Sequence, residues 1–328
     1  MINAMQIGYG YWGANVANKL YQLPEISFRV LAETDPKKRE RASSRFRDVN
    51  IVENYKEYLT NEIDVVFITT QTEYSYSIAM DVMNKGKHVF IEKPLAKNSE
   101  KAIDLINLSG SKNVVLHCDH LMVYNPVVRR IKQMISNGEI GEIQYIDIVR
   151  ANLGPIRRDI NALLDLAVHD IAVSDYLLGS LKPEEVQYCG TKTIGDKDTI
   201  SYLTMKQDGI LISINSSWVS PVKIRRMLVA GSKTMCIFDD TKVDKLIIYN
   251  KGIDIKQGLE YGEYEYKTRL GDVIIPHIQD EDSLMNSIQH FCDCVLNGKR
   301  SLSGPEQSLR VMRILDAAIK ISENQSFL

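Results

Sequence analysis

The sequence predicts an α/β protein with a doubly wound parallel sheet first, followed by an α/β domain built on a largely antiparallel open sheet. Three observations support this prediction. Apolar segments alternate with amphipathic ones in the first third, strands joined by tight turns dominate after residue 200, and 328 residues exceed one small core. We therefore expect one domain over residues 1–120 and a second, for substrate and oligomer contacts, over residues 121–328.

The strands expected in the first domain are almost continuous apolar runs, which is typical of parallel strands buried on both faces. They cover Met5–Gly8, Phe28–Glu33, Asp64–Thr69, His88–Glu92 and Val114–His117. The helices expected between them cover Trp12–Leu23, Pro36–Phe46, Tyr74–Lys85 and the segment after Asn98. This alternation predicts helices on both faces of the sheet.

The pattern of apolar and polar residues changes after about Tyr124. Alternating apolar strands joined by turns such as Gln207-Asp208-Gly209 indicate an antiparallel sheet. The expected strands cover Ile143–Arg150, Ile200–Lys206, Ile210–Val219, Ile224–Ala230 and Met235–Asp239. The expected helices cover Pro126–Ile135, Ala162–Leu178, Ser283–Leu296 and Pro305–Glu323. The segment Tyr249–Ile278 is polar, and its pattern favours no element.

Composition narrows the class of protein. Lys and Arg total 40 against 42 Asp and Glu, a net charge of −2 without long runs of one sign, so neither a nucleic acid nor a membrane surface is an expected partner. No apolar run approaches the roughly 20 residues that span a bilayer. The five cysteines include no CxxC pair, which argues against a disulfide framework and a zinc site. We expect a cytoplasmic protein with a small soluble substrate and no metal.

The segment Gly8-Tyr9-Gly10-Tyr11-Trp12-Gly13 has the GxGxxG spacing and lies between a strand and a helix. In that context Gly8 permits a tight turn, Gly10 lets the backbone approach a pyrophosphate, and Gly13 lets the helix pack closely. The helix N-terminus offers unpaired N–H groups to phosphates. The loop therefore predicts a Rossmann domain that binds a dinucleotide.

An acid follows the second strand. Asp35 lies about 20 residues beyond the last glycine, where a carboxylate binds the adenosine ribose hydroxyls and repels a 2′-phosphate, which favours NAD. Lys37, Lys38 and Arg39 come directly after it and leave NADP possible, because a basic side chain can bind that phosphate. The structural alternative for Asp35 is a helix cap before Pro36.

Two further segments carry groups suited to acid–base chemistry. Glu92-Lys93-Pro94 ends the fourth strand, and ligands of doubly wound sheets bind beyond the carboxyl ends of strands. Asp165 and His169 are four apart in an apolar segment, so a helix places them on one face. A carboxylate that fixes an imidazole tautomer is a recurrent catalytic device, although such a buried histidine is as readily a hydrogen-bonded core residue.

The glycine loop, the Glu92-Lys93-Pro94 strand end and the Asp165 to Asp170 helix, in this order, resemble the glucose-fructose oxidoreductase/inositol dehydrogenase family (Gfo/Idh/MocA). The stretches 120–126 and 137–141 extend the resemblance over nearly the whole chain. It implies a Rossmann domain and a second domain whose open sheet commonly forms oligomer contacts, so we expect a homodimer or homotetramer. The chain departs from the family after the third strand, where Gln71-Thr72 and Ser75 replace a Pro-Asn and a histidine.

The resemblance also implies roles for individual residues. Lys93 and His169 act on a substrate hydroxyl and Asp165 orients His169, while a hydride passes between a sugar carbon and nicotinamide. A histidine pKa of about 6.5 suits His169 as the base, and Lys93, with a lysine pKa of about 10.4, polarises the oxygen unless burial exchanges the roles. The expected cofactor contacts are Gly8, Gly10, Tyr11, Trp12, Gly13, Asp35, Thr70, Glu92 and Lys93.

Two segments, 152–161 and 217–225, resemble a branch of the family found with surface-polysaccharide biosynthesis, whose members act on nucleotide-linked sugars. We therefore expect a nucleotide-diphosphate sugar, oxidised at a ring hydroxyl such as that on C3. Arg157 and Arg158 are expected to clamp the diphosphate, and solvated loop arginines are an equal alternative. The expected substrate contacts are Tyr124, Arg157, Arg158, Asn161 and His169.

Two other functions stay open at this point. The substrate is alternatively a free sugar or polyol such as an inositol. The chain is alternatively a dinucleotide-binding regulator that kept the fold and lost the chemistry, but such a protein is expected to have replaced Lys93 or His169, and both are present.

Overall fold

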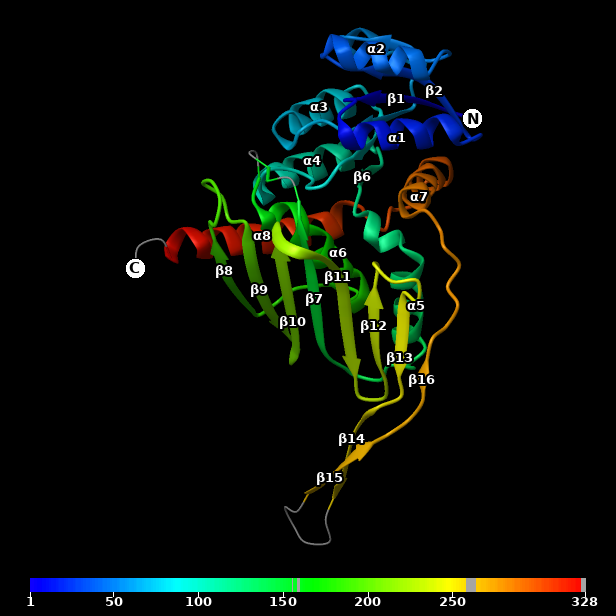
Figure 1. Cartoon of the computed structure of the whole chain (residues 1–328). Helices are drawn as coiled ribbons and strands as arrows, with labels where there is room; N and C mark the ends of the chain where they lie inside the picture. Colours follow the sequence, from blue (N-terminus) through cyan, green and yellow to red (C-terminus); the bar gives the residue numbers. More distant parts are fainter. Residues whose placement is uncertain (155, 158–159, 258–263, 326–328) are drawn as a thin grey trace. The chain divides into compact units, whose positions relative to one another are not determined.

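The computed structural model describes residues 1–154, 156–157, 160–257 and 264–325, which form two compact units (Figure 1). The first unit comprises Met1–Tyr124 and Asp282–Arg313, and the second comprises Asn125–Glu281 and Ile314–Leu328. The division into domains at residue 120 stays a prediction. It assigns everything after residue 120 to the second domain, whereas the chain returns to the first unit at Asp282.

The first unit is built on six parallel strands in the order β3-β2-β1-β4-β5-β6. This is the strand order of dinucleotide-binding sheets, and it confirms the predicted fold class. The strands are β1 (Ile2–Ile7), β2 (Ile26–Ala32), β3 (Asn50–Val52), β4 (Val65–Ile68), β5 (His88–Ile91) and β6 (Leu116–Cys118). The helices are α1 (Tyr11–Gln22), α2 (Pro36–Arg45), α3 (Thr72–Asn84), α4 (Ser99–Lys112) and α7 (Ser283–Asn297).

Helix α7 joins the first unit because its apolar face completes the core of that unit. Phe291 packs edge-on against Phe67 and Phe90, with ring centroids 5.5 and 5.7 Å apart. All three rings are fully buried. Burial of three aromatic rings is a large stabilising contribution, and it explains why a segment so late in the chain belongs to this unit.

The second unit contains an eight-stranded sheet in the order β16-β13-β12-β11-β7-β10-β9-β8, in which only the β7–β10 pair is parallel. Its strands are β7 (Ile143–Leu153), β8 (Glu185–Thr191), β9 (Ile200–Gln207), β10 (Ile210–Ser217), β11 (Val219–Gly231), β12 (Met235–Asp239), β13 (Leu246–Tyr249) and β16 (Val273–Ile274). Asp208 and Gly209 both have positive φ, 50° and 78°, as a tight hairpin turn requires. The predicted, largely antiparallel sheet is confirmed.

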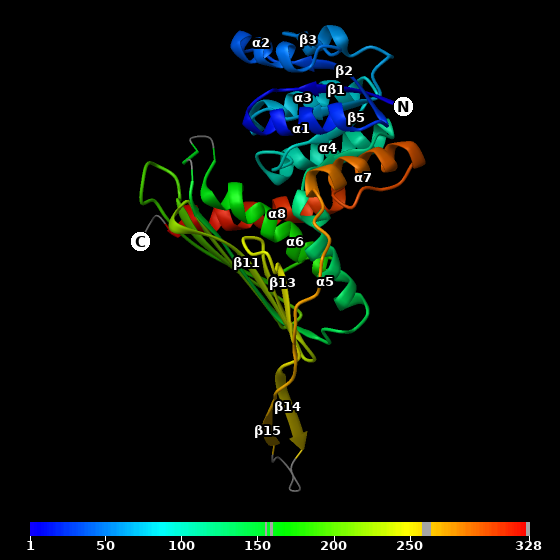
Figure 2. The same cartoon turned by 45° about the vertical axis from the view of Figure 1, so that its right-hand side comes forward.

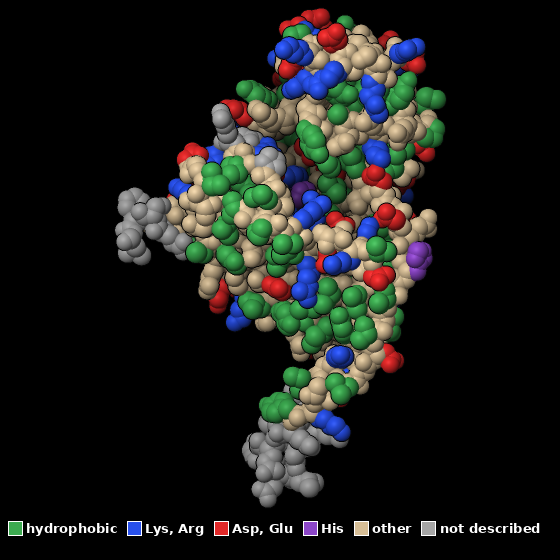
Figure 3. All heavy atoms as spheres, viewed as in Figure 1, with side chains coloured by type: hydrophobic (Ala, Val, Ile, Leu, Met, Phe, Trp, Pro, Cys, Tyr) green, Lys and Arg blue, Asp and Glu red, His purple; other side chains and the backbone are tan. Residues whose placement is uncertain are grey.

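Helices α5 (Pro126–Ser136) and α6 (Val168–Leu178) lie on one face of this sheet (Figure 2). Helix α8 (Pro305–Gln325) contributes residues to both units. The other face of the sheet exposes large side chains, among them Tyr145, Tyr202 and Leu211. In the space-filling view, hydrophobic side chains also gather over the strands of this sheet (Figure 3).

Some elements differ from the prediction. Short strands such as β3 and β16 lack enough alternation to be recognised, and the polar segment after Tyr249 forms a separate hairpin, β14 (Gly252–Gln257) with β15 (Tyr264–Arg269). The single helix predicted over Ala162–Leu178 is wrong in its first turns. Leu163–Ala167 is a π-helical turn, and α6 begins only at Val168.

Candidate functional site

The three glycines of the loop have three different environments. Gly8 has a φ of +97°, and a Cβ built on it would lie 2.9 Å from the carbonyl oxygen of Thr69. A Cβ on Gly13 would lie 2.7 Å from the carbonyl oxygen of Gly8. A Cβ on Gly10 would meet no described atom within 4 Å. Two glycines therefore serve close packing inside the protein, and Gly10 leaves backbone open to an incoming ligand.

The start of α1 fits a dinucleotide phosphate. Gly10 is the N-cap of α1 and supplies no side-chain hydrogen bond to the N–H groups of the first turn. Near Gly8, the buried hydroxyl of Thr70 has no hydrogen-bond partner among the described residues. Tyr11 is 92% exposed, and the side chain of Trp12 is half-buried. Open N–H groups at a positive helix end are what a pyrophosphate requires.

Two acids follow β2, and the structure gives them different partners. The Asp35 carboxylate accepts hydrogen bonds from the N–H groups of Lys37 and Lys38, at 2.9 and 3.3 Å, so it caps α2. Glu33, which was not among the predicted cofactor contacts, accepts hydrogen bonds from the N–H of Tyr9 at 2.7 Å and of Asp35 at 3.0 Å.

Glu33 thus connects the glycine loop to the end of β2. It lies 20 residues beyond Gly13, the expected separation for the ribose-binding acid. The spacing rule therefore fits Glu33 as well as Asp35, whose contact with a ribose stays a prediction.

Lys93 follows β5 beside two buried carboxyl groups. Ile91 pairs with Cys118 in the β5–β6 ladder, so the next residues, Glu92 and Asp119, are neighbours at the carboxyl edge of the sheet. Burial raises the pKa of Glu92 well above its ordinary value, and the charge of Asp119 adds to this while Lys93 opposes it. Burial also raises the pKa of Asp119, to about 7, against the hydrogen bond from Ser287 and the charge of Lys93. Two such carboxyls do not both ionise easily.

In the second unit the π-helical turn carries Asp165. Its Oδ2 accepts a hydrogen bond from the indole N–H of Trp218 at 3.2 Å, and its Oδ1 pairs with the guanidinium of Arg157 at 3.3 Å. His169 follows in the first turn of α6. A π-turn widens the helix, so the spacing of four residues does not give the regular helical face that was expected.

The residue after His169 is held by a buried ion pair. Asp170 in α6 accepts three hydrogen bonds from Arg150 in β7, at 3.0, 3.0 and 2.6 Å. Although burial opposes it, Asp170 raises the pKa of the Arg150 guanidinium. This bidentate pair and Trp218 fix the Asp165–His169 segment to the sheet. Local sequence patterns do not indicate Arg150 or Trp218, because these residues lie 20 and 53 residues from the carboxylates that they contact.

The remaining predicted substrate contacts have structural partners. Asn161 accepts a hydrogen bond from the N–H of Leu164 at 3.0 Å, at the start of the π-turn. Tyr124 is fully buried in the first unit and packs against the rings of His117 and His290. Arg158 lies outside the described residues. The substrate roles of all three stay predictions.

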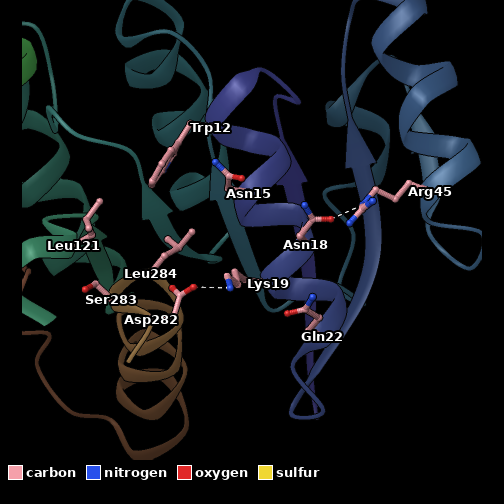
Figure 4. Close-up of a pocket in the computed structure, with 10 residues that line it drawn as sticks. All are labelled: Trp12, Asn15, Asn18, Lys19, Gln22, Arg45, Leu121, Asp282, Ser283 and Leu284. Carbon is pink, nitrogen blue, oxygen red and sulfur yellow. Dashed lines mark hydrogen bonds and ion pairs between the residues drawn. The ribbon is translucent and has the colours of Figure 1, made fainter. Parts of the chain in front are cut away.

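A pocket in the first unit lies between α1 and the start of α7 (Figure 4). Lys19 and Asp282 form an ion pair across it at 2.6 Å. Trp12 is the one predicted cofactor contact that lines this pocket. The pocket follows the side of α1 and does not include the three glycines.

Within the described residues, no helix is both long enough and apolar enough to cross a membrane. The strand order and the glycine loop define the class of protein, one with a dinucleotide-binding domain. Residues 2–120 match the family model "Oxidoreductase family, NAD-binding Rossmann fold", and residues 128–237 match the model "GFO/IDH/MocA C-terminal domain". The chain belongs to the Gfo/Idh/MocA family. Membership confirms the resemblance, the predicted NAD cofactor and the prediction of an enzyme.

The relatives of this chain include dehydrogenases named for a UDP-sugar and for an inositol. The chain is 27% identical to UDP-N-acetylglucosamine 3-dehydrogenase of Acidithiobacillus ferrooxidans over 76% of this chain and 79% of the relative. It is 23% identical to the NADP-dependent scyllo-inositol 2-dehydrogenase IolW of Bacillus subtilis, over 97% and 93% of the chains. The structure of GenD2 from gentamicin A biosynthesis, in complex with NAD, has a TM-score of 0.82 at 20% identity, covering 99% and 95%.

Proposed function

We propose that this protein oxidises a ring hydroxyl, such as that on C3, of a nucleotide-diphosphate sugar used in polysaccharide biosynthesis. The observation that carries the proposal is the anchored turn in which Trp218 and Arg157 hold Asp165, four residues before His169. Similarity to a UDP-sugar 3-dehydrogenase supports the substrate class.

The reaction needs a proton acceptor and a group that stabilises charge on the oxygen. When bound, the oxidised nicotinamide accepts a hydride from the carbinol carbon. Lys93 and His169 contact the hydroxyl, one taking its proton and the other polarising the oxygen. The ordinary pKa of histidine favours His169 as the acceptor. Asp165, held by Trp218, steadies the segment that carries the imidazole.

A free sugar or polyol is the second candidate substrate, and one observation favours it. The guanidinium of Arg157 lies 3.3 Å from the carboxylate of Asp165, so part of its charge is already compensated. A diphosphate clamp needs an available guanidinium fork. The NADP-dependent scyllo-inositol dehydrogenase among the relatives is consistent with a polyol.

The test is reduction of NAD⁺ or NADP⁺ with UDP-N-acetylglucosamine, N-acetylglucosamine and myo-inositol as separate substrates. We expect turnover of the UDP-sugar by wild type and a loss of about 10³-fold or more in Lys93→Met and His169→Asn. Lys97→Met, an exposed lysine four residues further on, is the matched control and keeps wild-type activity. Turnover of myo-inositol alone would refute the nucleotide-sugar proposal. If wild type and Lys93→Met both bind NAD and neither ever reduces it, oxidation itself is refuted.

The role of Arg157 is tested separately from the chemistry. If Arg157 clamps the diphosphate, Arg157→Met raises KM for the UDP-sugar about tenfold and leaves kcat within about twofold. If Arg157 serves only to hold Asp165, the same variant lowers kcat on every substrate and leaves KM unchanged. The two outcomes separate substrate binding from positioning.

We further propose a cytoplasmic homodimer or homotetramer assembled through the open face of the second unit's sheet. Tyr202 and Leu211 are 53% and 48% exposed on neighbouring strands of this face. Apolar side chains grouped on one surface favour association. Light scattering of Tyr202→Lys/Leu211→Lys is expected to give monomers, with the exposed Val243→Lys as the control. A wild-type monomer would contradict the proposal.

A further inference from the structure

A continuous line of buried polar groups crosses the first unit. The Ser287 hydroxyl in α7 donates to Oδ1 of Asp119 at 2.7 Å. The same hydroxyl oxygen lies 3.1 Å from Nε2 of His117, and Nδ1 of His117 lies 2.8 Å from the Ser301 hydroxyl. Three hydrogen bonds therefore join Asp119 to Ser301 through one imidazole. None of these four residues has a role in the proposed hydride transfer.

One end of this line is the edge of the sheet at which Lys93 lies. Glu92 and Asp119 are neighbours there, and the charge of Lys93 lowers the pKa of both carboxyls against the effect of burial. Oδ2 of Asp119 is buried without a hydrogen-bond partner among the described residues. A buried carboxyl with an open oxygen beside a lysine is suited to receive a proton and pass it on.

The middle of the line is His117, which is fully buried. Its ring stacks on Phe90, with centroids 4.7 Å apart and planes at 14°. Burial lowers the pKa of His117 well below its ordinary value, and His290 and His120 add to this. The imidazole is therefore neutral, with one donor and one acceptor nitrogen, each bound to a serine. Such a ring takes up a proton on one nitrogen and releases another from the second.

The other end of the line is at the surface. Ser301 lies in the turn between α7 and α8, where the side chain of Arg300 is 90% exposed and Leu302 is 43% exposed. Ser301 itself is partly exposed, so its hydroxyl is placed to exchange a proton with water. Ordered hydroxyls of this kind join readily to solvent.

We propose that Asp119, Ser287, His117 and Ser301 form a proton relay between Lys93 and water. It rests on the proposed function and deepens it by assigning the route of the hydroxyl proton. The Lys93 ammonium first gives a proton to ionised Asp119. In this relay the roles of Lys93 and His169 are exchanged. The resulting amine takes the substrate's hydroxyl proton as the C–H hydrogen leaves with its electron pair to the hydride acceptor, and His169 polarises the oxygen.

Protonated Asp119 then passes its proton to Ser287. Ser287 gives its own proton to Nε2 of His117, Nδ1 releases one to Ser301, and Ser301 releases one to water. One proton enters and one leaves, and Lys93 is an ammonium again. The hydrogen bonds afterwards all donate toward Asp119, as Ser287 does in the structure. Before the next turnover the hydroxyls of Ser287 and Ser301 rotate and the imidazole of His117 returns to its Nδ1–H tautomer, which needs no net proton.

The test follows the proton and the reduced cofactor separately. In a single turnover in unbuffered solution, a pH-indicator dye reports released protons and absorbance reports reduced nicotinamide. We expect equal rates in wild type and proton release about tenfold slower or more in His117→Phe and Ser287→Ala. Rescue is measured separately, in steady-state turnover followed by the absorbance of reduced nicotinamide, because imidazole would buffer the dye signal. Added imidazole is expected to restore the turnover of His117→Phe. A purely structural loss would not be restored.

The matched control is His290→Gln, which changes a second histidine beside His117 that lies outside the relay and is expected to release protons as wild type does. Wild-type proton release in His117→Phe, or no rescue by imidazole, would overturn the relay. A cofactor-free measurement keeps the two proposals distinguishable. Nitrogen NMR is expected to find His117 neutral at pH 7, and a charged imidazole refutes the relay even if sugars are oxidised. If wild type oxidises no sugar, the proposed function fails, and NMR alone decides whether the relay exists.

Discussion

The two units hold their candidate functional segments by different means. In the first unit the dinucleotide loop is made of backbone, namely three glycines and the open N–H groups at the start of α1. In the second unit the segment from Asp165 to Asp170 is held by side chains that come from distant strands. A backbone site is specified by a few neighbouring residues, whereas a side-chain site depends on how the whole sheet folds. The two therefore fail differently when single residues are changed.

The largest effect is expected where a buried charge loses its partner. Arg150→Met leaves Asp170 ionised and buried, which costs about 4 kcal/mol of unfolding free energy. Urea unfolding of the variant measures it. Arg150→Met/Asp170→Leu removes both charges and is expected to recover most of the loss. If the double variant is as unstable as the single one, the pair contributes packing and not charge compensation.

Backbone substitution in the first unit is expected to have the next largest effect. Gly13→Ala places a methyl group 2.7 Å from the Gly8 carbonyl oxygen and costs about 3 kcal/mol, with loss of NAD binding. Gly10→Ala meets no described atom within 4 Å, so it keeps wild-type stability. Its methyl group nevertheless lies where the ligand approaches, and titration with NAD is expected to give a weaker Kd. Equal stability losses in the two variants would contradict this division of roles.

This difference between the units also explains how far the sequence carries the prediction. The order of strands and helices in the first unit follows from apolar runs and from the Gly8 to Gly13 spacing, which are local. Glu33 was within reach of the same spacing rule, because it lies 20 residues after Gly13. The prediction falls on Asp35 because it follows the second strand and also lies about 20 residues past the last glycine, so the spacing rule alone does not separate the two acids.

Local sequence patterns do not predict the residues that contact the Asp165 to Asp170 segment. Trp218 reaches Asp165 across 53 residues, and nothing in the sequence near either residue indicates that contact. The π-turn at Leu163–Ala167 depends on these anchors as well, because a regular helix is the default for such an apolar run. The hydrogen bonds of His117 are likewise beyond local sequence patterns, because Ser287 and Ser301 lie 170 and 184 residues further along the chain.

A smaller effect is expected from the indole contact in the second unit. Trp218→Phe removes the hydrogen bond to Asp165 and leaves a small cavity at a residue only 2% exposed, which together cost about 2 kcal/mol. Because Asp165 loses a fixed partner, kcat on the sugar is expected to fall about tenfold while KM changes little. Steady-state kinetics measure this. Tyr188→Phe, which removes the hydrogen bond from a buried ring to the carboxylate of Asp198, is the control for losing such a contact elsewhere. An unchanged kcat in Trp218→Phe means that Asp165 needs no anchor for the reaction.

The smallest effect on the free energy of unfolding is expected at Asp282, where the chain returns to the first unit. Asp282 caps α7 through the N–H of Met285 and pairs with Lys19 of α1. Burial opposes ionisation, but Lys19 and the helix N–H groups lower the pKa of Asp282 below its ordinary value of 3.8.

A lowered folded-state pKa means that this stabilisation is complete above about pH 4 and is lost as pH falls through the folded value. Asp282→Asn keeps a capping oxygen and removes the charge, so the expected loss at pH 7 is under about 1 kcal/mol. The difference between the variant and wild type is expected to vanish well below pH 4, and urea unfolding at both pH values measures it. A difference that persists in acid would show that Asp282 stabilises α7 by its shape and hydrogen bonds and not by its charge.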